Sequence, residues 1–327
     1  MAKYSSAAFE ILLVDGYNLL AAKVQSVSIK VSNVIQSKTH GLGDKWAGNS
    51  ATGVLQGTVT QSGAFFEDAT ASMHDAFKAM TGAVRLLVCT CFGNMIGKLF
   101  FGFQGVYEGA YALVSKVDAL TVADAAYVVS GAVDIGVIVQ DWVAKTANWN
   151  TKTDGFPVDY TLDPTNLATT ITSNSIANPS VVTTPVPHGL VTGQVVLVSG
   201  VATSSPTING QQTVTVIDPT HFSVPVNVTI AGTGGSFVDA STPNGGVGYL
   251  LVSAFTGFSG VVVKIRSSAD DITYADLVTF ASVTAPPPDA SAAQRLTVAG
   301  TIARYLSVSG TVTGSGSIQP FAGFKRS

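Results

Sequence analysis

Short runs in which apolar and polar residues alternate one by one constrain the fold of this chain more than any other feature. Residues 24–32 and 54–62 both alternate in this way. Successive side chains of a β-strand point to opposite faces, so each run predicts a strand with one buried and one solvated face. Further strand-like runs are residues 84–92, 95–103, 125–130, 132–139, 194–199, 213–217, 222–230, 249–254, 260–266, 273–280 and 305–308. Residues 122–126 also fit a short helical turn. The pattern predicts a mainly β fold.

One segment carries a helical period instead. Residues 69–80 place apolar side chains at the spacing of a helix that lies on a sheet: Met73, Ala76, Phe77 and Met80. Asp68 or Thr70 can cap its start, and Gly82 can end it. We therefore expect a β-sandwich or barrel of antiparallel sheets with one packed α-helix. The apolar stripe is best read as core packing and not as a cofactor site.

A long connection separates the first two alternating runs. Residues 37–52 contain several glycines and Trp46. An ordered loop of this length within a compact domain is usually functional, and the alternative is plain disorder.

Composition changes along the chain and predicts its domains. The middle of the chain is rich in Thr, Val, Pro, Asn and Gly and lacks Lys and Arg. His188-Gly189-Leu190 and Asn209-Gly210 are turn signals between short strands in this part. We expect an inserted small all-β domain over residues 166–241, within a larger domain made of residues 1–165 and 242–327.

The low charge content points to self-association. Charged residues make up 11% of the chain and hydrophobic residues 46%, against roughly 25% charged in a typical soluble domain. A free monomer with so few charges is poorly soluble unless much of its surface meets other copies. The alternative is a plain β-rich protein with a Ser/Thr surface. The net charge of -3 argues against a protein that grips nucleic acid through a basic face.

No group of residues predicts an active site. The histidines have no paired nucleophile at a recognisable spacing; they are His40, His74, His188 and His221. Asp270-Asp271 has no further carboxylate at the spacing of a calcium loop. We expect no catalytic, cofactor-binding or metal-binding residues, no cofactor and no enzymatic activity.

The cysteines and the apolar runs indicate the cellular compartment in which the chain is made. Cys89 and Cys91 lie too close in a strand for an unstrained disulfide and predict reduced thiols. Residues 1–10 lack a secretory signal. The most apolar run, residues 86–97, is shorter than the roughly 20 residues of a membrane helix. We expect a chain of cytoplasmic origin without membrane insertion.

Several motifs resemble one family of phage proteins. The motifs are Ile11-Leu12-Leu13-Val14-Asp15-Gly16-Tyr17-Asn18-Leu19, Leu42-Gly43-Asp44-Lys45-Trp46, Phe65-Phe66-Glu67-Asp68, Ser130-Gly131-Ala132-Val133-Asp134 and Val263-Lys264-Ile265-Arg266. Together they resemble major tail proteins, the tail tube proteins of long-tailed, non-contractile bacteriophages. The middle segment, with Pro187-His188-Gly189-Leu190 and Ile208-Asn209-Gly210, resembles a small β-module that recurs in phage structural proteins.

The resemblance implies a function and its partners. Such proteins form hexameric rings that stack around a channel through which DNA is ejected. It implies that the partners are further copies of the chain, a tape measure protein and a tail terminator protein, with transient passage of DNA and no specific DNA binding. It places the protein in the virion tail, assembled in the host cytoplasm.

The resemblance also suggests which residues carry these roles. Candidates for the channel-facing surface are Ser26, Ser28, Lys30, Gln56, Thr58 and Thr60. Candidates for contacts between stacked rings are His40, Leu42, Asp44 and Trp46.

Two other classes of function compete with a tail tube. A β-sandwich adhesin or glycan-binding module needs an exposed aromatic platform, for which the middle segment offers Phe222 and Phe237. A hydrolase needs a reactive constellation, which the sequence does not supply.

Overall fold

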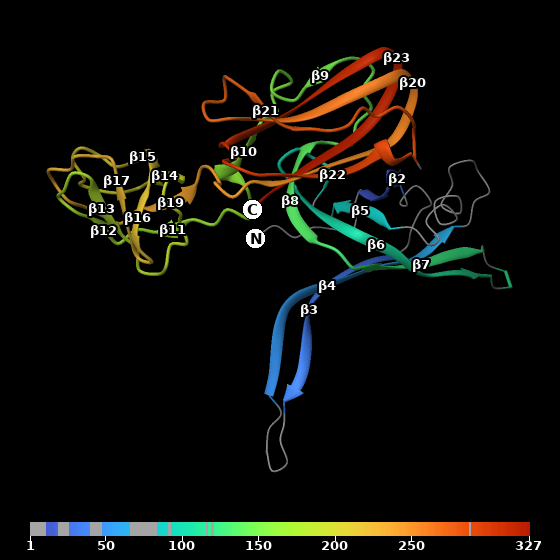
Figure 1. The fold of residues 1–327 in the computed structure, drawn as a ribbon, viewed down its shortest axis with the longest axis horizontal. Helices are drawn as coiled ribbons and strands as arrows, with labels where there is room; N and C mark the ends of the chain where they lie inside the picture. Colours follow the sequence, from blue (N-terminus) through green and yellow to red (C-terminus); the bar gives the residue numbers. More distant parts are fainter. Residues whose placement is uncertain are drawn as a thin grey trace.

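The described part of the chain is built from antiparallel β-sheets. The computed structural model describes residues 11–18, 26–39, 48–65, 84–90, 93–115, 117–118, 121–287 and 289–327. They form a 14-stranded sheet, which we call the body, and sheets of four and five strands, which together we call the module (Figure 1). The prediction of a mainly β fold with antiparallel sheets is confirmed. The helix predicted over residues 69–80 lies outside the described residues.

The bounds of the elements follow. The body contains β1 (Ile11–Val14), β2 (Tyr17–Asn18), β3 (Ser26–Thr39), β4 (Gly48–Phe65), β5 (Arg85–Thr90), β6 (Leu99–Val114), β7 (Val122–Val129), β8 (Val133–Gln140), β9 (Trp149–Asn150), β10 (Val158–Asp159), β20 (Gly246–Ser268), β21 (Ala275–Thr279), β22 (Ala293–Val298) and β23 (Tyr305–Arg326). The module contains β11 (Thr169–Thr170), β12 (Ser173–Asn174), β13 (Ser180–Thr183), β14 (Val195–Ser199), β15 (Gly210–Thr213), β16 (Thr215–Asp218), β17 (His221–Val224), β18 (Gly232–Thr233) and β19 (Ser236–Asp239). The helical elements of the described ranges are the single turns η3 (Tyr160–Leu162) and η4 (Ala290–Ala292), neither of which could span a membrane.

Strand β1 is buried on both faces, which explains its unbroken apolar sequence. Ile11 and Leu13 pack in one hydrophobic cluster, and Leu12 and Val14 pack in another on the opposite face. The turn after β1 uses Asp15 and Gly16, both with positive φ (48° and 90°). Such a two-residue turn matches the twist of a hairpin, so β2 folds back directly onto β1.

The body divides into two wings where β7 passes into β8. Strand β6 pairs with β7 along residues 106–114 and with β8 along residues 99–103. At the corner, Gly105 has a φ of 68°, and a Cβ on Gly131 would lie 2.5 Å from the carbonyl oxygen of Gln104. The glycines let the two strands bend together. The lower wing is β3–β4–β7–β6, and the upper wing is β6–β8–β23–β20 (Figure 1).

Two long strands organise the upper wing. β20 and β23 have 23 and 22 residues and pair with each other along most of their length, with several bulges. β21 and β22 extend the sheet beside β20, and β8, β9 and β10 pair with β23. The largest hydrophobic cluster lies between these strands and includes Trp149, Phe255, Phe258, Phe280 and Phe324.

The module leaves the body after β10 and returns before β20 (Figure 1). Its first and last strands are neighbours, because Thr169 pairs with Phe237. Beneath them, the Asn166 amide donates to the carbonyl oxygen of Asp239 at 2.7 Å. Thr242 and Ile302 exchange backbone hydrogen bonds of 3.1 and 2.7 Å. We call this connection the neck.

A half-buried arginine supports the body side of the neck. The Arg326 guanidinium donates to the carbonyl oxygens of Ile302, Ala303 and Arg304 at 2.8–3.0 Å. Its Cζ lies 4.0 Å from the centroid of the Tyr160 ring. Burial lowers the pKa of Arg326 to about 10, so it remains charged at neutral pH. The neck is therefore pinned to the body and is not a free linker.

Part of the predicted loop 37–52 is strand. Residues 37–39 belong to β3 and residues 48–52 belong to β4. These segments are rich in Ser, Thr, Asn and Gly, which carry little apolar alternation, but each pairs with the facing strand. Backbone hydrogen bonds between the two strands hold these segments, and such bonds do not require an alternating pattern of apolar side chains.

Three other local predictions needed correction. Residues 122–126 are strand and not a helical turn, because β7 is held between β4 and β6. β17 ends at Val224 instead of residue 230, since Pro225 follows. β6 begins at Leu99 instead of residue 95, because Gly97 with a φ of 85° forms a turn.

Candidate self-assembly surface

The hairpin β3–β4 brings most of the channel-facing candidates onto one face. Ser26, Ser28, Lys30 and Thr60 are exposed and Thr58 is half-buried. Directly opposite residues of antiparallel strands share a face, and the pairs are Ser26 with Ser62, Ser28 with Thr60, and Lys30 with Thr58. We call these six residues the polar face. Gln56 pairs with Ser32 through the backbone, but its side chain lies outside the described set.

The other face of the same hairpin packs onto the body. Val59 is fully buried, and Val27 and Ile29 pack against the cluster that contains Tyr127. Gln61 is only 1% exposed on this face, a burial that its polar character did not predict. The hairpin is therefore fixed at its base with its polar residues turned outward.

The outward surface becomes more apolar across the lower wing. Val128 of β7 lies opposite Thr58 and is 39% exposed. Tyr107 of β6 lies opposite Val128 and is 42% exposed. Valine and tyrosine side chains also fill the core of the body, but these two remain exposed to solvent.

Strand β3 presents a long unpaired border. This 14-residue strand pairs with β4 along one side, with two shifts in register, and no other described strand lies beside it. Figure 1 shows the hairpin extending away from the rest of the body. Unpaired backbone N–H and C=O groups on such an edge are a template for another strand, so edges of this length are normally shortened, charged or covered. Lys30 is the charged residue nearest the base of this edge.

The ring-stacking candidates cannot be placed. His40, Leu42, Asp44 and Trp46 lie between the ends of β3 and β4, outside the described residues. Their assignment stays a prediction.

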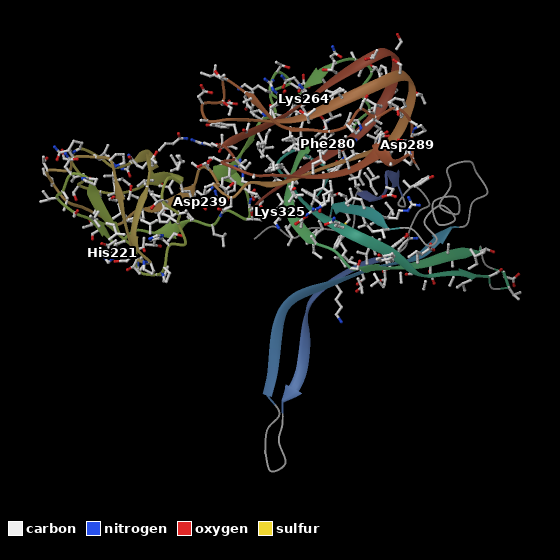
Figure 2. All side chains as sticks on the ribbon, viewed as in Figure 1. His221, Asp239, Lys264, Phe280, Asp289 and Lys325 are labelled. Atoms are coloured by element: carbon white, nitrogen blue, oxygen red, sulfur yellow. The ribbon has the colours of Figure 1, made fainter. Side chains whose placement is uncertain are left out.

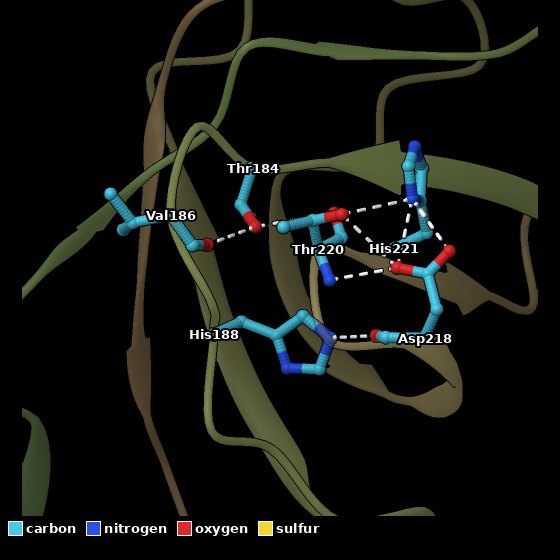
Figure 3. A network of polar contacts seen from close by, with 6 residues as sticks. All are labelled: Thr184, Val186, His188, Asp218, Thr220 and His221. Atoms are coloured by element: carbon cyan, nitrogen blue, oxygen red, sulfur yellow. Dashed lines mark hydrogen bonds and ion pairs between the residues drawn. The ribbon is translucent and has the colours of Figure 1, made fainter.

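Both histidines of the module, His188 and His221, contact residues of the turn between β16 and β17 (Figure 3). The Leu190 N–H donates to Nδ1 of His188 at 3.0 Å, so Nε2 carries the proton and donates to the Asp218 carbonyl oxygen at 2.9 Å. His221 Nδ1 contacts the Asp218 carboxylate at 2.9 Å. The backbone N–H of Thr220 and then His221 lower the pKa of Asp218 to about 2. The Thr220 hydroxyl lies 3.2 Å from the same His221 nitrogen, and together these contacts close the β16–β17 turn; His40 and His74 are outside the described residues.

A buried carboxylate in the body was missed by sequence reasoning. Asp134 of β8 is 2% exposed and accepts hydrogen bonds from Tyr249 at 2.5 Å, from Arg295 at 2.8 Å and from Lys325 at 3.0 Å. Figure 2 marks Lys325 on β23. Burial raises the pKa of Asp134, but these hydrogen bonds outweigh it, so the pKa lies below its ordinary value. All its partners come from other strands, and the cluster joins β8, β20, β22 and β23.

Metal binding is a question for all the described residues, and glycan binding is a question for the module. They contain no group of three or more His, Cys, Asp or Glu side chains that could hold a metal ion. Phe222 and Phe237, the aromatic candidates of the module, are 0% and 2% exposed and pack edge to face at 5.4 Å. The module, which the structure describes in full, therefore has no exposed aromatic platform for a sugar ring.

Comparisons with known proteins give distant structural likenesses. No protein-family model and no curated protein matches the sequence. The tail of an empty gene transfer agent particle, refined with C6 symmetry, matches 34% of this chain and 79% of its own at 11% identity and a TM-score of 0.27. The virion of a native gene transfer agent matches 34% of this chain and 83% of its own at 12% identity and a TM-score of 0.26. Likenesses this distant do not establish a shared fold, so the function has to be argued from the surface itself.

Proposed function

We propose that this protein is the structural subunit of a phage-type tail tube and is not an enzyme. Its copies form hexameric rings, and the rings stack into a tube whose channel carries DNA during ejection. The observation that carries the proposal is the β3–β4 hairpin, which combines a 14-residue strand edge, unpaired among the described strands, with an outward polar face.

The unpaired edge supplies the drive to associate. Exposed strand edges gain backbone hydrogen bonds when a strand of a neighbouring copy adds to them. Subunits that associate head to tail form a ring when their rotation closes, and such rings can stack further into a tube. The low charge content of the chain, 11%, is consistent with a surface that is covered by other copies.

The polar face suits a channel for DNA. It carries hydroxyl side chains with Lys30 as its cation, and the whole chain has a net charge of -3. A surface that neutralises few phosphates releases few counterions and therefore holds DNA weakly. Such a lining lets DNA pass without being retained.

The proposal includes the surroundings of the protein. The tube would be assembled in the host cytoplasm and become part of the virion tail. Its length and end would be set by a tape measure protein and a tail terminator protein.

Microscopy of the purified chain tests the proposal. The protein is concentrated stepwise, followed by analytical ultracentrifugation, and imaged by negative stain at each step. We expect rings or tubes with a hollow centre and six subunits per turn. Monomers at every soluble concentration, or amorphous clumps without a channel, would overturn it.

A further inference from the structure

The body carries an apolar groove close to the neck. Two adjoining hollows of about 260 and 230 Å³ share Ile96 and Phe156 in their walls. Three apolar side chains around them are exposed: Met95 at 67%, Phe156 at 58% and Leu162 at 80%. Exposed apolar side chains gathered around a hollow mark an interaction site more often than scattered ones do.

The hairpin tip between β6 and β7 is the second unpartnered apolar feature. Leu113 near the end of β6 is 51% exposed, and Val117 beyond it is 92% exposed. In a monomer, Val117 would hold its side chain almost wholly in water beyond the end of β6.

Strand β6 separates the groove from the tip. Ile96 precedes the first residue of β6, and Val117 follows its last residue, with 16 residues between the strand ends. At about 3.3 Å per residue, β6 is on the order of 50 Å long, and its bend at Gly105 shortens the direct distance between the two features. The tip cannot enter the groove of its own molecule, so only another copy can bring them together.

Charges near the two features are compatible with contact. In the sequence, Lys116 and Asp118 flank Val117. The groove walls include Asp154, Asp163 and Lys145. Lys145 in the groove wall offers an opposite charge to Asp118 of the tip.

We propose that the β6–β7 tip of one copy docks into the groove of the next, with Val117 against Phe156 and Leu162. The contact is heterologous, because two different surfaces meet, and it leaves one free tip and one free groove until a ring closes. It rests on the proposed function and deepens it by naming a second lateral joint beside the β3 edge; a ring needs both joints, and β6 then sets the spacing between neighbours.

Charge substitutions at exposed positions test the joint without disturbing the core. V117E and L162E each place a carboxylate in an apolar contact, so each variant alone should sediment as a monomer where the wild type forms rings. The control is I176E, at a module residue that is 66% exposed, which should assemble as the wild type does. Circular dichroism spectra of all three should match the wild type, which shows that the subunit fold is intact.

Mixtures of variants distinguish head-to-tail joining from any symmetric contact. An equal mixture of V117E and L162E has one intact tip and one intact groove, so it should stop at two-subunit complexes. An equal mixture of V117E and L162K pairs Glu with Lys at the altered joint, so rings should return.

The outcomes separate this inference from the proposed function. If the wild type forms tubes and V117E or L162E also does, the lateral joint is wrong and the tube stands. If the wild type forms head-to-tail filaments without a channel, and the variants behave as described, the joint stands and the tube is wrong. Monomeric wild type overturns both.

Discussion

Asp134 is the residue whose contacts most clearly stabilise the described part of the body. Its carboxylate is 2% exposed and receives hydrogen bonds from Tyr249, Arg295 and Lys325. A buried charge without its partners costs several kcal/mol, so the cluster holds only while every member is present. The strands that it joins include both long strands of the upper wing.

Replacing Asp134 with Asn should destabilise the fold strongly. The D134N side chain keeps its shape but loses the charge that compensates Arg295 and Lys325, so we expect a loss of about 3 kcal/mol in the free energy of unfolding. Urea denaturation of the disassembled subunit measures it. The matched control is D276N, which removes the ion pairs of the exposed Asp276 with Lys264 and Arg266 and should cost less than about 1 kcal/mol. Equal losses in the two variants would contradict the role given to Asp134.

Asp134 and a second paired carboxylate, Asp159, predict a dependence of stability on pH. Folded Asp134 and Asp159 have pKa values below the ordinary value. For Asp159, hydrogen bonds from Arg304 and Thr161 outweigh the burial that raises the pKa. A carboxyl with a lowered folded pKa stabilises the fold above its unfolded pKa of about 3.9, and this stability is lost as the pH falls through the folded pKa.

We therefore expect the melting temperature to hold from neutral pH down to about pH 4 and to fall below it. D134N should start lower and fall less steeply, since one of the titrating groups is gone. Thermal melts between neutral pH and strong acid measure both curves. Parallel curves would show that Asp134 does not contribute through its charge.

At this scale, the sequence predicted surface residues better than buried partners. Ser28 and Lys30 were assigned to a solvated face because they alternate with Val27 and Ile29, and the structure has them exposed. Asp134 was not recognised, because Arg295 and Lys325 lie 161 and 191 residues away along the chain. Contacts of that separation leave no local pattern in a single sequence.

Among the elements, the β3–β4 hairpin carries the proposed function. Its base, where Ser26–Ser32 pairs with Gln56–Ser62, is part of the lower wing. Its outer part pairs only with itself among the described strands. The outer part can therefore be deleted while the base, which pairs with β7, is kept.

Shortening the hairpin should abolish assembly and leave the subunit folded. Residues 33–55 are replaced by Asn-Gly, which forms a two-residue turn between Ser32 and Gln56. The matched control removes residues 167–238 of the module and joins Asn166 to Asp239 through Gly-Ser-Gly, since these two residues already contact each other. Negative stain and sedimentation should show monomers for the first variant and tubes for the second. Tubes from the shortened variant would remove the role of the hairpin.

Element boundaries were predicted less well than element types. Alternation located β3 and β4, but their outer ends are polar and were assigned to a loop, although each pairs with the facing strand. Similarly, β20 was expected as two short strands, because Gly257 and Gly260 interrupt its apolar pattern. Bulges at these positions keep the strand continuous against β23, and a bulge depends on the partner strand as much as on local sequence.

In the whole molecule, the proposed channel makes a prediction about charge. Adding S28K and T60K to the polar face should make assembled protein retain short DNA duplexes, because twelve added lysines would converge in each hexameric ring. The logarithm of the affinity should fall with the logarithm of salt concentration, by about 0.9 for each phosphate contacted. The control, T213K with T215K, adds the same charge to exposed residues of the module and should bind DNA much less. Equal binding by both would place the polar face outside the channel.

The neck has a practical consequence for the whole molecule. Because Thr169 and Phe237 are paired neighbours and the neck beneath them is hydrogen-bonded to the body, the insertion enters and leaves at nearly one point. Any small foreign domain whose own termini lie close together could be grafted at that point. A filament built from such chimaeras would display its cargo at a regular pitch, once for every subunit along its length.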